Sequence, residues 1–173
     1  MEQVYLNVTA PPVAHVRIES LVREHQTKLS RYLRRMVGDP DVALDLAQDV
    51  FFAAYRTLEA DPVRPLSAGW LYKTATNNAI SFLRRKKIIR FTPLDRDWEV
   101  RGLRIDERSS ASIDLQHAMQ RLPSEQAAAI MLTSYAGYSS QEAAAILGTS
   151  PDAIRQRVCR AMRTLRAVMT ERV

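Results

Sequence analysis

The stretch of sequence that decides the fold runs from residue 139 to residue 165 and reads SSQEAAAILGTSPDAIRQRVCRAMRTL. A short helix is predicted over residues 141–147, because Ser139 or Ser140 can cap its start and acidic and small residues follow. Gly148 comes directly after this helix, where glycine readily adopts the left-handed backbone conformation that ends a helix. The first part of the stretch therefore predicts one short helix with a sharp end.

A second, longer helix is predicted directly after this turn. Ser150 is a suitable N-cap and Pro151 a suitable first helical residue, because proline lacks the N–H group that would be unpaired there. Ala144 provides a small side chain where the two helices would cross. A helix, a glycine turn and a second helix in this order predict a helix-turn-helix.

The two faces of the second helix differ in chemistry. One stripe is apolar and is expected to face the core: Ile154, Val158, Ala161, Met162, Leu165 and Met169. The other faces carry the candidate contacts to DNA: Arg155, Gln156, Arg157, Arg160 and Arg163. Arginine can bind guanine and glutamine can bind adenine in the major groove, while other arginines neutralise phosphates. A solvated basic face of a helical bundle is the alternative, and the density of arginine favours DNA binding.

Five further helices are predicted upstream, over residues 13–36, 41–58, 67–89, 113–122 and 124–135. The segment Gly38-Asp39-Pro40 separates the first two, and Asp39 or Asp41 can cap the second. Residues 61–65 hold two prolines and separate the second helix from the third. The candidate core of the first helix consists of Val16, Leu21, Leu29, Leu33 and Met36.

Helical periodicity is lost between residues 91 and 112, where acidic and basic residues alternate and serines follow. We therefore expect an all-α fold of two small helical domains, residues 13–90 and 113–173, joined by a flexible linker over 91–112. The C-terminal domain contains the helix-turn-helix. Trp98 lies in the linker, where it either packs on a neighbour or contacts a partner.

Composition and charge restrict the class of function. The net charge is +6, which is compatible with a nucleic-acid partner. The single cysteine, Cys159, is expected to be a small buried apolar residue, and no disulfide framework, metal site or cofactor site is predicted. No signal peptide or apolar stretch long enough for a membrane span is present, so a cytoplasmic protein is expected.

Several motifs together resemble those of bacterial sigma-70 family RNA polymerase sigma factors, in the compact extracytoplasmic-function group. In the C-terminal half they are Leu-Pro-Ser-Glu-Gln at 122–126, Gly-Tyr-Ser at 137–139 and Ala-Ala-Ile-Leu-Gly at 144–148. In the N-terminal half they are Asp-Leu-Ala-Gln-Asp-Val-Phe at 45–51 and Trp-Leu-Tyr at 70–72, followed by Asn77, Asn78 and Leu-Arg-Arg at 83–85. The resemblance covers residues 21–166.

The resemblance implies that residues 13–90 are sigma region 2 and residues 113–173 are sigma region 4. Region 2 would bind core RNA polymerase through Asp45, Gln48, Asp49 and Phe52. It would also bind the unpaired minus-ten strand through the loop at 60–66 and through Asn77, Ser81, Arg84 and Arg85. Region 4 would read the minus-thirty-five duplex through the polar residues of its second helix named above, from Arg155 to Arg163. Promoter DNA, core polymerase and an anti-sigma factor are the implied partners.

Three other functions compete with a sigma factor that directs transcription initiation. A helix-turn-helix transcriptional regulator that works without core polymerase would bind duplex DNA tightly by itself, usually as a dimer. An adaptor of polymerase would not depend on Arg155 or Arg160 for promoter binding. An enzyme is not expected, because no nucleophile–base pair, glycine-rich phosphate loop or carboxylate cluster occurs in the sequence.

Overall fold

The computed structural model describes residues 13–91 and 110–170, and every regular element in these ranges is helical. The N-terminal half consists of α1 (Val13–Val37), α2 (Pro40–Ala60) and α3 (Ala68–Phe91). The elements of the C-terminal half are α4 (Ser110–Gln120), α5 (Ser124–Ile130), the π-helix η1 (Met131–Tyr135), α6 (Ser140–Leu147) and α7 (Pro151–Thr170). The predicted all-α class is therefore confirmed.

The turn between α1 and α2 is fixed by its own sequence. Gly38 has a φ of 83°, in the left-handed region that suits glycine, and ends α1. The Asp39 carboxylate accepts hydrogen bonds from the backbone N–H groups of Asp41 and Val42, at 2.9 and 3.1 Å. Of the two aspartates considered from the sequence, Asp39 is thus the N-cap of α2.

The core of the N-terminal half lies between α1, α2 and α3. Leu29, Leu33 and Met36 are buried as predicted, and Leu21 packs against the core from a partly buried position. Val16 is 52% exposed, which corrects its prediction as a core residue. In that turn of α1 it is Ala14 that is buried, so the register of the first turns differs from the predicted one.

In the C-terminal half the helix-turn-helix has the predicted local signals. Ser139 caps α6 in a capping box, in which its hydroxyl accepts from the Glu142 N–H and the Glu142 carboxylate accepts from the Ser139 N–H. Gly148 ends α6 with a φ of 63°. The Ser150 hydroxyl accepts from the Ala153 N–H at 3.2 Å at the start of α7.

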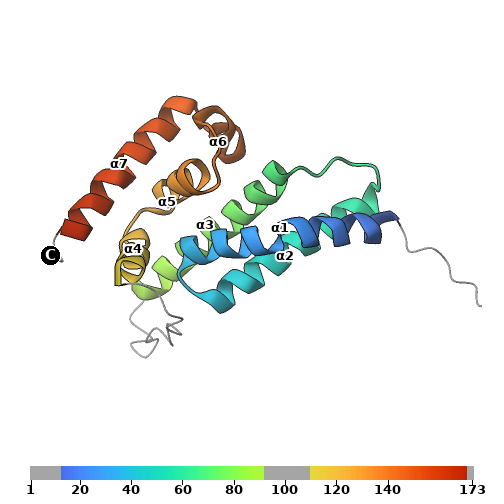
Figure 1. Cartoon of the computed structure of the whole chain (residues 1–173), viewed down its shortest axis with the longest axis horizontal. Helices are drawn as coiled ribbons and strands as arrows, with labels where there is room; N and C mark the ends of the chain where they lie inside the picture. Colours follow the sequence, from blue (N-terminus) through green and yellow to red (C-terminus); the bar gives the residue numbers. More distant parts are fainter. Residues whose placement is uncertain (1–12, 92–109, 171–173) are drawn as a thin grey trace, which may run out of the picture.

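The two halves pack against each other into one molecule (Figure 1). Helix α3 contacts α5 and α6, and α1 contacts α4 and η1. Buried side chains from both halves form one continuous hydrophobic cluster. Helix α7 lies at the outer side of the C-terminal half in Figure 1, away from α2. The sequence predicted two domains but gave no sign of this contact between them.

Helix boundaries differ slightly from the expected ones. Helix α4 begins at Ser110, within the predicted linker, since serine is well tolerated in a first turn whose N–H groups have no intrahelical partner. Trp98 and the remainder of the linker lie outside the described residues. In the part of the chain that the structure describes, no helix is both long and apolar enough to cross a membrane.

Candidate nucleic-acid interface

Helix α7 separates a buried stripe from a basic outer face. Ile154, Ala161 and Leu165 are buried against α4, α5 and α6. The opposite faces carry the predicted minus-thirty-five contacts: Arg155, Gln156, Arg160 and Arg163 are exposed, and Arg157 is half-buried. The Arg155 guanidinium pairs with the carboxylate of Asp152 one turn earlier on the same helix. Four long polar side chains therefore reach solvent from the first four turns of the helix.

Three positions on α7 are more exposed than predicted. Cys159 is exposed, because its position lies between the buried Ile154–Ala161 stripe and the arginines. Met162 and Met169 are 38% and 39% exposed. These two methionines line a cleft of about 560 Å³ between the two halves, together with residues of α1, α4 and η1. Their partial exposure thus results from the gap between the halves, which the periodicity of one helix cannot reveal.

Helix α3 has the predicted minus-ten contacts on its accessible sides. Leu71, Ala75 and Ala79 are buried against α1 and α2. The predicted contacts Asn77, Ser81, Arg84 and Arg85 are all exposed. Thr76 is fully buried, and its hydroxyl is 2.7 Å from the Tyr32 hydroxyl of α1. This buried contact fixes the rotation of α3, so Asn77 must face away from the core.

The loop that precedes α3 is held by a residue that the sequence analysis did not identify. The Arg17 guanidinium, from the start of α1, donates to the backbone carbonyls of Pro62 and Arg64, the latter at 2.8 Å. The predicted minus-ten loop at 60–66 is thereby tied to α1. The sequence signal was weak, since an arginine on a solvated helix face has no marked pattern.

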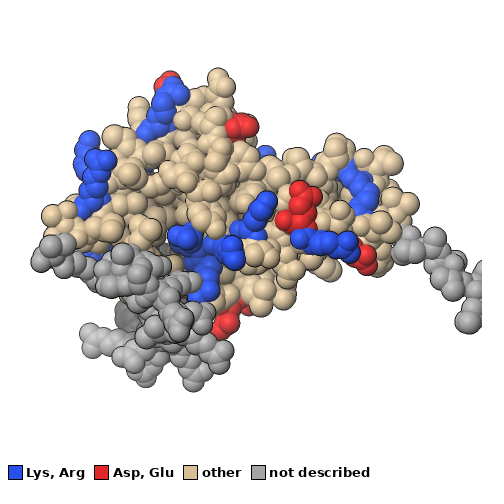
Figure 2. All heavy atoms as spheres, in the orientation of Figure 1, with Lys and Arg blue, Asp and Glu red and all other residues tan. Residues whose placement is uncertain are grey.

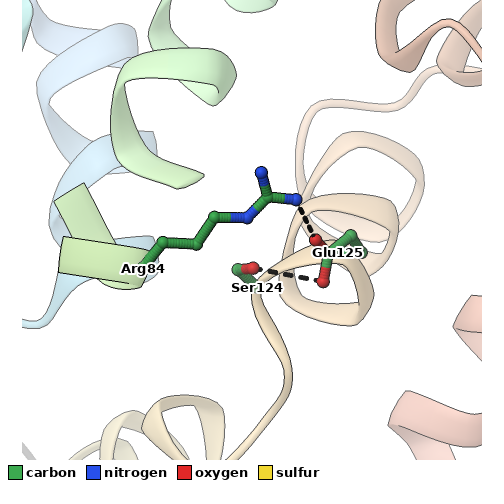
Figure 3. Close-up of polar contacts among 3 residues, drawn as sticks. All are labelled: Arg84, Ser124 and Glu125. Atoms are coloured by element: carbon green, nitrogen blue, oxygen red, sulfur yellow. Dashed lines mark hydrogen bonds and ion pairs between the residues drawn. The ribbon is translucent and has the colours of Figure 1, made fainter. Parts of the chain in front are cut away.

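Arg84 contacts the other half of the molecule. Its guanidinium pairs with the Glu125 carboxylate at the start of α5, and the Ser124 hydroxyl lies 3.2 Å from the second Glu125 oxygen (Figure 3). The hydrogen bond from Arg84 lowers the pKa of the Glu125 carboxyl below its usual value, against the opposing effect of partial burial. The predicted minus-ten contact Arg84 is therefore already engaged in the free chain.

The exposed face of α2 carries the predicted polymerase contacts. Asp45, Gln48, Asp49 and Phe52 are all exposed, and Phe52 is 62% exposed. The opposite face of α2 is buried against α1 and α3 through Leu46, Val50, Ala54 and Leu58. An exposed phenylalanine beside two carboxylates is typical of a protein-binding surface, because aromatic anchors dominate many such interfaces.

Charge is unevenly distributed over the surface. Figure 2 shows basic side chains along the C-terminal half and a further basic group near the junction of the two halves. The exposed charged residues of α7 are mainly arginines, with Asp152 at its start. A surface of this kind favours phosphate contacts, because each neutralised phosphate releases a counterion.

Comparisons with known proteins agree with this arrangement. The model of sigma-70 region 2 matches residues 21–88, and the model of sigma-70 region 4 matches residues 112–165. The sigma factor NccH of Alcaligenes xylosoxydans xylosoxydans is 34% identical over 158 residues, which cover 86% of this chain and 84% of NccH. The ECF sigma factor SigE of Mycolicibacterium smegmatis is 30% identical over 154 residues, or 86% of this chain and 60% of SigE.

A solved structure has a similar fold across both halves. The structure of CnrH in complex with the cytosolic domain of CnrY matches with a TM-score of 0.64 and 26% sequence identity, and it covers 92% of this chain and 93% of that one. Together with the two family models and the similarity to NccH, this likeness extends from α1 to α7. The chain therefore belongs to the sigma-70 family of RNA polymerase sigma factors, in the extracytoplasmic-function group.

Proposed function

We propose that this sigma factor binds core RNA polymerase through α2 and reads promoters with two separate helices, α3 and α7. Residues 13–90 would hold the polymerase and the minus-ten strand, and residues 113–173 would hold the minus-thirty-five duplex. The observation that supports this assignment best is that the predicted contacts on all three helices lie opposite buried stripes. Of the predicted contacts on these three helices only Arg157 is half-buried, and all the others are exposed.

The minus-thirty-five assignment follows from α7. Arg155 and Gln156 lie in its first two turns, and in a helix-turn-helix this part of the second helix enters the major groove. A bidentate arginine–guanine pair contributes about 1–3 kcal/mol of discrimination against other bases. Arg157, Arg160 and Arg163 would contribute affinity through phosphates.

The minus-ten assignment follows from α3 and the loop before it. Asn77 and Ser81 are exposed one turn apart and offer an amide and a hydroxyl to an unpaired base. Arg84 and Arg85 lie further along the same helix, where they would contact the phosphates of the strand. Single-stranded nucleic acid is commonly bound by this combination of polar readout and positive charge.

An anti-sigma factor and a cytoplasmic location complete the proposal. CnrH, which is 26% identical to this chain, was solved with the cytosolic domain of CnrY. We infer that a comparable partner restrains this chain and acts in the same compartment as the polymerase. The chain would act by binding alone, without chemistry of its own.

The proposal is tested by run-off transcription with purified core polymerase on promoter-containing fragments. We expect discrete transcripts that depend on the chain and that are lost or strongly reduced by Phe52→Ala, Asn77→Ala or Arg155→Ala. Val16→Ala and Arg23→Ala are matched controls, because they remove an exposed apolar side chain and an exposed arginine from α1. Core binding, measured separately, should fall only with Phe52→Ala.

A different outcome would exclude the proposal. Tight duplex binding by the chain alone, without core binding and without transcripts, would indicate a helix-turn-helix regulator that works independently of polymerase. Unchanged promoter binding after Arg155→Ala would remove α7 from the DNA interface.

A further inference from the structure

The connection between α2 and α3 is exposed, yet its backbone is held in a defined conformation. Residues 61–65 are all exposed, and Figure 1 shows the connection at the same end of the N-terminal half as the start of α1. The Asp61 carboxylate accepts a hydrogen bond from the Val63 N–H at 3.2 Å. The Asp61 carbonyl accepts from the Arg64 N–H at 3.1 Å. The connection therefore begins with a hydrogen-bonded turn over residues 61–64.

Arg17 holds this turn from α1. One terminal nitrogen of its guanidinium donates to the Pro62 carbonyl, and the other donates to the Arg64 carbonyl at 2.8 Å. These carbonyls lie on either side of Val63. A guanidinium suits this role because its donors lie in one rigid plane, so that both hydrogen bonds fix a single arrangement of the two carbonyls. Arg17 therefore restrains the backbone both before and after Val63.

Val63 projects from the restrained turn into solvent. Its side chain is 84% exposed, while its own N–H is bonded to Asp61. The branched side chain of valine has few rotamers, and Pro62 and Pro65 restrict the φ angles beside it. A single exposed valine is ordinary on a protein surface. Here the unusual feature is that an arginine from another helix holds the backbone on both sides of it.

The stability of the fold gives little reason for this restraint. Ordering the backbone of one residue lowers an equilibrium constant about 5- to 30-fold. In a core the burial of apolar side chains offsets that cost, but none of residues 61–65 is buried. A loop that is ordered during folding does not have to be ordered again when a ligand binds, so it binds the ligand more tightly than a mobile loop.

We propose that Arg17 is a positioning residue for minus-ten recognition, which holds the turn over 61–64 so that Val63 contacts an unpaired base of the strand. The inference rests on the proposed function, which assigns the loop at 60–66 to that strand. Arg17 acts through the loop and not on the strand itself, because its terminal nitrogens already donate to the two loop carbonyls.

Loss of the restraint should reduce selectivity among minus-ten sequences more than it reduces affinity. A mobile turn has to be ordered to contact the preferred base, whereas a base that the turn does not contact requires no ordering. Phosphate contacts from Arg84 and Arg85 on α3 do not involve the turn and would remain. We therefore expect Arg17→Ala to lower the preference for one base about 5- to 30-fold, with little change for the other bases.

Backbone relaxation measured by NMR on the free full chain tests the restraint itself. The order parameters of the Val63 and Arg64 N–H groups should be about 0.85 in the wild-type chain and below about 0.6 in Arg17→Ala. Arg23→Ala removes an exposed arginine from the same helix and should leave both values unchanged. Equal order parameters in the wild-type chain and in Arg17→Ala would overturn the positioning role.

Transcription with core polymerase from a promoter library randomised in the minus-ten element tests the consequence. Sequencing of the transcripts should show that Arg17→Ala and Val63→Ala weaken the preference for a base at the same position, while Arg23→Ala does not. Core binding and the preference for minus-thirty-five sequences should be the same in all of these variants. A loss that is equal for every minus-ten sequence, or no loss in Arg17→Ala, would overturn the proposal.

Arg17→Lys separates the geometry of the guanidinium from its charge. Lysine keeps the positive charge but not the planar pair of donors, so it should restore only part of the preference. Full restoration by lysine would overturn positioning by the two-pronged contact. Failure of the proposed function gives a different result, because the wild-type chain would then give no selective transcripts, whereas the order parameters would still show whether Arg17 restrains the turn.

Discussion

Helices α3 and α7 carry the two predicted DNA contacts, yet their surroundings differ. On α7, at the outer side of the molecule, Arg155 pairs within its own helix, and Arg160 and Arg163 form no ion pair within the described residues. On α3, Arg84 pairs with Glu125 of the other half. The predicted minus-thirty-five contacts on α7 are therefore accessible, whereas the predicted minus-ten contact Arg84 is already paired with the other half.

This difference has a chemical consequence. The Arg84 guanidinium must give up its carboxylate partner before it can bind a phosphate, whereas Arg160 and Arg163 need no such exchange.

The largest expected effect is on the accessible surface. Arg155→Ala should weaken the binding of a minus-thirty-five duplex by holoenzyme about 5- to 150-fold, because a bidentate contact to a base contributes about 1–3 kcal/mol. Fluorescence anisotropy at constant salt measures it, with Arg23→Ala as control. An equal loss of affinity for every duplex sequence would instead indicate that Arg155 contacts a phosphate. Arg155 on α7 and Arg84 on α3 would then have the same kind of predicted role.

A smaller effect is expected from the cap of the helix that touches both surfaces. Ser139→Ala removes the capping box of α6 and should lower the free energy of unfolding by about 1 kcal/mol. Urea denaturation followed by circular dichroism measures this change, and Ser20→Ala on the exposed side of α1 is the control. Equal stability of the two variants would mean that the box contributes nothing to α6.

The smallest expected effect concerns pH and the contact between the halves. The pKa of Glu125 is lowered in the folded chain by Arg84, so its stabilising effect is fully present above its ordinary value of 4.5 and is lost as pH falls through the lower folded value. The free energy of unfolding, measured by urea denaturation, should therefore differ between wild type and Glu125→Gln above about pH 5.

That difference should shrink as pH falls below the ordinary glutamate value and through the lower folded pKa of Glu125. A difference that persists at the lowest pH where both chains remain folded would indicate that the ion pair is not its source. Added salt should reduce the difference as well, because the pair is exposed.

Much of the fold could be predicted because its signals are local. The residues that cap or end the helices act on backbone groups only a few positions away, so their roles can be predicted from the sequence. They are Asp39, Ser139, Gly148 and Ser150. The burial of side chains was predicted less well at the start of α1 and along the cleft between the two halves. Val16 and the two outer methionines of α7 were assigned to the core by periodicity, which places residues on a face but does not say what covers it. Cys159 was expected to be buried because a lone cysteine is usually a small apolar core residue, and it is exposed.

In the candidate site, too, some features could be predicted from the sequence and others could not. Its residue types and helix positions could be predicted, and the structure leaves them accessible on α2, α3 and α7. The contact partners of Arg84 and Arg17 could not be predicted, because nothing near them in sequence indicates Glu125 or the loop after α2. Resemblance to a family identifies surfaces, and it does not reveal how the two halves of one chain lie against each other.

The sequence by itself therefore determined the helices, their caps, the helix-turn-helix and the basic character of its outer face. These depend on hydrogen bonds and side-chain spacings within about one helical turn. Only the tertiary structure decided that the halves dock and that Arg84 meets Glu125, 41 residues away, while Gln116 bonds to Arg34, 82 residues away. Such pairings depend on how separate elements pack together in space, and the periodicity of a single helix contains no information about them.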